Sequence, residues 1–182
     1  MPRLPEILDP SALPEDKRQL FEYLKQTRGS VRPPFSIVMN SPEAADRIAH
    51  LGGYIRFESS LPAAVVELAT LAVSRAFDCR HEWAMHTGFA REAGVSEAAI
   101  EAIGHRRGLV GLSPEESLPV QYSRELLEKL KVSDETFAAA RERYGDAGVI
   151  DLTATVGYYC MMACILNAIE LIPPPTAEQL PE

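Results

Sequence analysis

The stretch at residues 78–86, DCRHEWAMH, concentrates side chains that can do chemistry. On a helix that begins at Asp78, Cys79, Glu82 and His86 occupy positions i, i+3 and i+7. Because successive helical residues are about 100° apart, these three side chains share one stripe about 60° wide. A thiol, a carboxylate and an imidazole on one face are unusual for a helix that only contacts water. The spacing therefore indicates a functional site.

Two kinds of chemistry fit this stripe. Cys79 lies in the first turn, where the helix dipole and the free N–H groups favour a thiolate. Glu82 and His86 are one turn apart, so the carboxylate can orient the imidazole and raise its pKa, which suits a proton donor near neutral pH. The alternative is a solvated Glu–His pair that stabilises the helix by only roughly 0.3 kcal/mol.

No metal site is expected, because His81 points to the opposite side and no HxxxH or HExxH spacing is present.

Proline, glycine and capping residues mark the helices that must hold these side chains. No segment alternates with period two, and no Asn-Gly or Asp-Gly pair marks a hairpin, so the expected fold class is all-α. Residues 1–41 are rich in proline and are expected to form an extended arm with one short helix. The expected helices cover about 15–27, 42–53, a segment that opens at Pro62, 78–93 with Asp78 as its N-cap, 97–104, 114–130, 134–144 and 147–171.

Length and composition bound the class of protein. The chain has 182 residues, which predicts a single domain over 1–182, and a net charge of −8, which argues against nucleic acid as a partner. The N-terminus has prolines and acidic residues where a secretory signal needs an apolar segment, so a cytoplasmic location is expected. Cys79, Cys160 and Cys164 are an odd number of cysteines, and the last two lie one helical turn apart. Reduced thiols are therefore expected.

The segment from Leu152 to Ile169 has no formal charge, and its length raises the question of a transmembrane helix. Its hydrophobicity is diluted by threonines, a glycine, two tyrosines and Asn167, while Asp151 and Glu170 bracket it closely. Helices that are apolar all round also occur in protein cores. The sequence predicts a buried central helix and no membrane span.

The core motif at residues 61–104 resembles the carboxymuconolactone decarboxylase family, in which a buried glutamate precedes an EWxxH element, a small-residue helix and a glycine turn. Glu67, the Glu82-Trp83 pair with His86, and Gly94 stand at these positions. The segments MPRLP, RPPFSIVMNSPE and DLTATVGYYCMMACILNA are similar to further parts of the family. The resemblance implies an alkylhydroperoxidase D-like helical bundle and a homo-oligomer, either a trimer or a hexamer, that assembles through apolar faces such as that of the last helix.

The family is divided between two chemistries, and Glu82 lies at the point of division. The alkylhydroperoxidase D branch has a CxxCxxxH element, to which Cys79, His81 and His86 are similar, but a second cysteine stands where this chain has Glu82. A dithiol peroxidase resolves a sulfenate by attack of a second thiolate, and a carboxylate cannot form that disulfide. The EWxxH pattern is instead similar to the decarboxylase branch. A thiol-dependent antioxidant protein that uses Cys79 remains the alternative.

The resemblance implies a lyase without a cofactor, active in the catabolism of aromatic compounds. In such a substrate the lactone carbonyl accepts the electrons that loss of carbon dioxide leaves behind, and the enzyme stabilises the dienolate and protonates it. His86 is assigned to proton donation or dienolate stabilisation, and Glu82 to orienting His86 or exchanging its proton. Glu67 is assigned to a buried partner in the same relay, and its alternative is a role in helix packing.

A small anionic substrate also needs a cation and a pocket. Arg75 lies two turns beyond Glu67, and Arg56 follows Tyr54 in a short connection, so either could bind a carboxylate, with Arg75 preferred. Trp83 and His81 are further candidates for substrate contact, although an aromatic residue on an amphipathic helix is more often part of a core. Three polar residues of the last helix are also candidates that the sequence does not separate: Tyr158, Tyr159 and Asn167.

Overall fold

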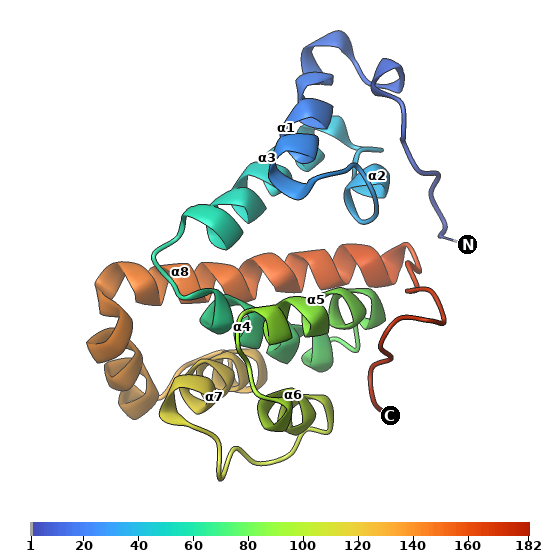
Figure 1. Cartoon of the computed structure of the whole chain (residues 1–182). Helices are drawn as coiled ribbons and strands as arrows, with labels where there is room; N and C mark the ends of the chain where they lie inside the picture. The colour runs from blue at the N-terminus through green and yellow to red at the C-terminus, as the bar shows by residue number, and fades with distance from the viewer. Residues whose placement is uncertain (1) are drawn as a thin grey trace.

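The computed structural model describes residues 2–182, and within this range it contains helices and no strands (Figure 1). The all-α prediction is confirmed. The longer helices are α1 (Gln19–Arg28), α3 (Pro42–Gly53), α4 (Ala63–Ala76), α5 (Arg80–Glu92), α6 (Glu97–Gly104), α7 (Pro114–Lys129) and α8 (Asp134–Ala168). The short ones are η1 (Pro10–Ala12), η2 (Glu15–Lys17), α2 (Phe35–Val38) and the π-helix η3 (Tyr54–Glu58).

Helix α4 is the centre of the molecule and packs against α5, α6, α7 and α8. Every residue from Val65 to Arg75 is buried, because this helix is apolar nearly all round and neighbouring helices cover all of its sides. In Figure 1, α8 crosses the molecule, with the N-terminal helices α1 to α3 on one side and α4 to α7 on the other. The central position of α4 explains why Glu67 is buried, as the sequence predicted.

The proline-rich first 41 residues hold more structure than an extended arm. They form η1, η2, α1 and α2, and Leu20, Phe21 and Leu24 of α1 are buried in the same apolar core as α3 and α8. The expected short helix at 15–27 is present as η2 and α1. Residues 2–41, called the N-terminal unit below, therefore fold against the rest of the protein.

Helix α5 begins one residue later than the sequence suggests. Asp78 has a φ of 48°, which is outside the helical range, and Cys79 is the N-cap residue. Asp78 is therefore not the cap; its carboxylate instead lies 3.0 Å from a guanidinium nitrogen of Arg106. As a consequence Cys79 precedes the helix, and its thiol is not on the stripe that Glu82 and His86 share.

Helix α8 has a kink at Gly145, where φ is 70° and ψ is 179°. The kink separates residues 134–144 from residues 146–168, in agreement with the two helices that the sequence predicted there. The side chain of Ser133 caps the first part by accepting a hydrogen bond from the backbone N–H of Thr136. The second part is the apolar central helix that the sequence predicted.

By length and composition α8 could cross a membrane, with a mean hydropathy of 1.6 over its most apolar stretch, of which 56% is buried inside the protein. Its outward face leaves small or apolar residues exposed: Ile150, Thr153, Gly157 and Cys164. The predicted homo-oligomer would bury this face of α8 between subunits. Its existence remains a prediction.

Replacing Gly145 by alanine tests the kink. The backbone conformation at Gly145 is one that only glycine adopts without strain, so G145A is expected to lower the free energy of unfolding by about 1–3 kcal/mol. Gly88 is the matched control, because it lies exposed in α5 with open space around its Cα. G88A is expected to leave stability unchanged or raise it by up to about 1 kcal/mol in chemical denaturation. Equal effects of the two substitutions would contradict this account of Gly145.

Candidate active site

His86 is held between two buried carboxylates. Its Nδ1 atom lies 2.6 Å from Oε2 of Glu67, and its Nε2 atom lies 3.1 Å from Oε2 of Glu82. All three residues are buried, with 5–6% of each exposed. Glu67 comes from α4, while Glu82 and His86 lie one turn apart on α5, so the packing of α4 on α5 assembles the group.

The carboxylates decide the charge of His86. Burial alone would lower its pKa, but Glu67 and Glu82 favour the charged ring and together raise the pKa to about 9. At neutral pH His86 is therefore an imidazolium. Each N–H of the ring faces a carboxylate, so the ring is fixed in orientation and carries a proton near the surface of a cavity.

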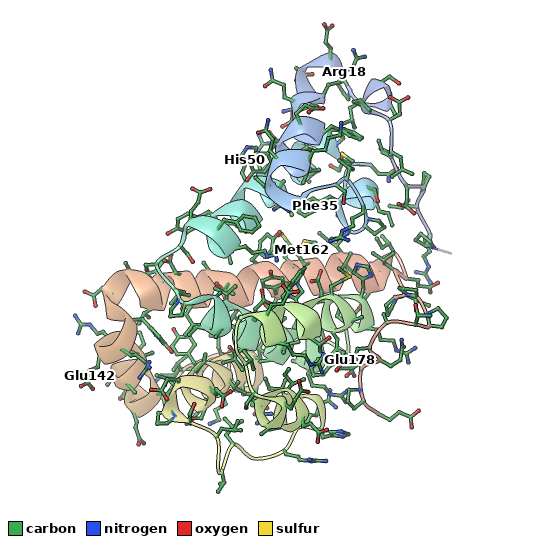
Figure 2. All side chains as sticks on the ribbon, viewed as in Figure 1. Arg18, Phe35, His50, Glu142, Met162 and Glu178 are labelled. Atoms are coloured by element: carbon green, nitrogen blue, oxygen red, sulfur yellow. The ribbon has the colours of Figure 1, made fainter. Side chains whose placement is uncertain are left out.

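The cavity has a volume of about 280 Å³ and lies between the N-terminal unit, η3, α5 and α8. Phe35 of the N-terminal unit and Met162 of α8, both labelled in Figure 2, line it from different elements. Helix α5 contributes His81, Glu82, Met85, His86 and Phe89, and α8 contributes Tyr158, Tyr159 and Met162. The other walls are Arg56 and Phe57 from η3, and Thr27, Arg28, Ser30, Arg32, Pro33, Pro34 and Phe35 from the N-terminal unit.

Aromatic side chains confine the His86 ring within this cavity. The rings of Tyr159 and Phe89 meet it edge-on, with centroids 5.0 and 5.5 Å away. Burial raises the pKa of both Tyr158 and Tyr159, so their hydroxyl groups stay protonated and can donate hydrogen bonds. Asn167 lies elsewhere, with its Nδ2 donating to the carbonyl of Phe77 over 2.8 Å. Of the three polar residues of α8 that the sequence left undecided, Tyr158 and Tyr159 therefore line the cavity and Asn167 does not.

His81 also lines the cavity, although the helical projection placed it opposite Glu82 and His86. It is 7% exposed, and neither ring nitrogen has a hydrogen-bond partner among residues 2–182. Burial lowers its pKa, so the ring is neutral at neutral pH and has one donor and one acceptor. A buried imidazole without a partner beside a cavity is suited to bind a polar group of a ligand.

Cys79 lies outside the cavity. It is fully buried against Ile37, Ala163 and Leu166, and burial raises the pKa of its thiol to about 12. The expectation that the helix dipole favours a thiolate is therefore corrected, because the loss of solvation outweighs it. All three cysteines are free, as the sequence predicted. The fold also brings the α8 segment that contains Cys164 up to Cys79, a proximity that nothing in the sequence indicates.

Two further residues that the sequence assigned to substrate contact lie away from the cavity. Arg75 donates from Nη1 to the carbonyl of Pro181 over 2.5 Å, and its Nη2 lies 3.5 Å from Asp78. Trp83 is 1% exposed and packs in a separate core with Leu68 of α4. Of the two arginines that the sequence proposed, Arg56 is the one that lines the cavity, because it lies on the π-helix η3, whereas Arg75 lies at the C-terminal end of α4.

Sequence reasoning missed the contribution of the N-terminal unit. Arg28, Arg32 and Phe35 line the cavity, and the only signal for them was the RPPF segment, whose prolines mark a turn without indicating its neighbours. Among residues 2–182, no three His, Cys, Asp or Glu side chains are arranged to hold a metal ion.

Together these features define an all-helical protein in which His86, flanked by Glu67 and Glu82, lies at a cavity. Residues 42–118 match the model of the Carboxymuconolactone decarboxylase family. This match includes Arg56, Glu67, His81, Glu82 and His86. A comparison with curated proteins gives no significant match.

Solved structures share the fold over nearly the whole chain. The alkylhydroperoxidase AhpD core of an uncharacterized peroxidase-related protein from Ralstonia eutropha JMP134 is 18% identical, with a TM-score of 0.77 over 96% of this chain and 93% of that one. An uncharacterized peroxidase-related protein from Silicibacter sp. TM1040 is 16% identical, with a TM-score of 0.74 over 96% and 94%. The debrominase Bmp8, in complex with 2,3,4-tribromopyrrole, is 14% identical, with a TM-score of 0.64 over 91% and 88%. These likenesses establish an alkylhydroperoxidase D-like fold.

The charge of His86 can be tested by titration. Its ring is expected to titrate near pH 9 in nuclear magnetic resonance spectra, and E67Q is expected to lower that pKa because one of the two flanking charges is lost. E128Q removes an exposed carboxylate of α7 and is the matched control. Because the folded pKa is raised, the stabilisation from these ion pairs is complete below about pH 6.5 and is lost as the pH rises through about 9. An unchanged titration in E67Q would refute the role of Glu67.

Proposed function

We propose that this protein is a cofactor-independent acid/base enzyme, a carboxy-lyase or a related lyase or hydrolase, that acts on a small lactone or oxo-acid carboxylate. The observation that carries the proposal is the imidazolium of His86, fixed by Glu67 and Glu82 at the wall of a cavity of about 280 Å³. A fixed, charged proton donor at a cavity is suited to protonate a carbanion or an enolate.

The two carboxylates have different positions and therefore different roles. Glu82 lines the cavity with His86, whereas Glu67 does not and lies behind the ring at the shorter distance of 2.6 Å. We assign Glu67 to orienting the imidazolium through Nδ1. Glu82, on the substrate side, passes a proton from water to Nε2 after His86 has given its own proton to the product.

A decarboxylation would proceed as follows in this site. The bond between the substrate carbon and its carboxylate breaks, carbon dioxide leaves, and the electron pair moves through the double bond to the lactone carbonyl oxygen. His86 stabilises the resulting dienolate and then transfers its proton from Nε2 to carbon. His81 and the hydroxyl groups of Tyr158 and Tyr159 are the neutral groups available to bind the carbonyl oxygen.

The thiol-dependent alternative has less support from the geometry. Two related folds are described as peroxidase-related, and Cys79 is the residue on which such an activity would depend. However, its thiol is buried outside the cavity with a pKa of about 12, so the reactive thiolate is scarce at neutral pH. Glu82 also stands where a resolving cysteine would be needed. These features favour the acid/base reaction.

Turnover of 4-carboxymuconolactone, followed by carbon dioxide release, tests the proposal. H86Q is expected to lower kcat by about 10²–10⁴-fold, because it removes the general acid. C79S is the control and is expected to retain the activity and the fold. Peroxide consumption, measured on the same samples, is expected to be absent.

The opposite pattern would refute the acid/base proposal. Peroxide turnover that C79S abolishes, together with carbon dioxide release that H86Q leaves unchanged, would assign the protein to thiol chemistry.

A further inference from the structure

Three arginines line the same cavity: Arg28, Arg32 and Arg56. None of them lies within 4.0 Å of a carboxylate oxygen among residues 2–182, although the chain has 26 acidic and 18 basic residues. Most other arginines of the described chain have such a carboxylate. Three guanidinium groups without a carboxylate partner among the described residues therefore line one cavity, although the protein has a net negative charge.

Arg56 is held by aromatic rings rather than by hydrogen bonds. Its guanidinium carbon lies 4.7 Å from the centroid of Phe89 and 5.2 Å from that of Phe57. Stacking fixes the plane of a guanidinium and leaves its N–H edge free for an anion. Because Phe89 also contacts the ring of His86, Arg56 is one side chain away from the proton donor.

Arg28 reaches the cavity from the N-terminal unit. Its guanidinium carbon lies 4.5 Å from the centroid of Phe35, and its two terminal nitrogens donate to the carbonyl of Ala49 and the hydroxyl of Thr27 over 2.9 and 2.7 Å. A guanidinium has five N–H groups, so donors remain for a ligand. Arg28 and Arg56 both lie close enough to the Tyr158 phenol to oppose the rise of its pKa.

The connection that carries Arg56 is itself anchored. It is a π-helix, a conformation that is rare and often found at functional sites. At its start the hydroxyl of Tyr54 donates to the buried Asp151 over 2.9 Å, and just beyond it Ser60 donates to the other oxygen of the same carboxylate over 3.3 Å. Asp151 therefore fixes η3 to α8 and positions Arg56.

We propose that Arg28, Arg32 and Arg56 form an anion subsite for a second carboxylate of the substrate, one that is retained in the reaction. The identity of the retained group rests on the proposed function. An arginine bound to the departing carboxylate would stabilise the ground state, because that charge disappears as carbon dioxide forms, and the reaction would be slowed. An arginine bound to a carboxylate that stays charged carries no such penalty and holds the substrate in place.

The subsite combines residues from two parts of the chain. Arg56 lies within residues 42–118, which match the family model and also contain Glu67, Glu82 and His86, whereas Arg28 and Arg32 lie outside them. The N-terminal unit thus contributes two of the three arginines that would bind a second anionic group.

Calorimetric binding of two probes of equal length, adipate with two carboxylates and hexanoate with one, tests the subsite. Adipate is expected to bind the intact protein more tightly, and R56Q and R28Q are each expected to weaken adipate binding by about tenfold or more, because each removes a charge-assisted contact. R80Q is the matched control: Arg80 is exposed, does not line the cavity, and is expected to leave binding unchanged. Thermal unfolding of each variant distinguishes lost binding from lost folding, and R56Q stands on a different element from R28Q.

Binding is measured without turnover, so this test and the test of the reaction can fail separately. Adipate preference that the variants abolish, in a protein that releases no carbon dioxide, would retain the subsite and reject the lyase. Equal binding of adipate and hexanoate, no binding of either, or unchanged adipate binding in both R28Q and R56Q would overturn the subsite.

Discussion

The buried Glu67–His86–Glu82 group is the interaction on which the arrangement of this protein depends. Taking a single charge out of water costs several kcal/mol, and only a partner with good geometry offsets that cost. Here three ionisable groups from two helices satisfy one another, with both ring nitrogens of His86 facing carboxylate oxygens. Helices α4 and α5 must keep their relative register for these contacts to persist. The apolar surroundings of α4 supply that constraint.

The same low-dielectric interior has opposite effects on two residues of one short segment. Around His86 it strengthens the attraction to the carboxylates, so the ring is charged. Around Cys79 the loss of solvation is the largest effect and raises the pKa of the thiol, so the thiol is neutral at neutral pH. A shift of the helix start by one residue separates them, since it places the thiol in a different apolar cluster from the cavity. Proximity in sequence therefore does not imply a shared role.

Much of this arrangement could be predicted from local pattern. The Glu82–His86 contact follows from a separation of one helical turn, and the burial of Glu67 follows from a helix that is apolar all round. The contact between Glu67 and His86 joins two helices, and no spacing within either helix encodes it. The preference for Arg75 over Arg56 as the arginine at the cavity was wrong, also because long-range contacts decide where each side chain lies. Arg56 lies on a π-helix, and Arg75 is bound by Pro181 of the C-terminal segment. The N-terminal unit reaches the cavity through contacts between residues far apart in the sequence. Its prolines predict turns, but they do not predict which other elements the segment packs against.

The contact of Arg75 with Pro181 ties the end of the chain to its centre. Leu180 packs on the same apolar cluster as Trp83, and Pro181 and the Trp83 ring both lie close to Gly104. Trp83 is the only tryptophan of the chain and is 1% exposed. Its fluorescence is therefore an intrinsic optical reporter of the packing of α4, α5, α6 and the chain terminus, at a distance from the cavity.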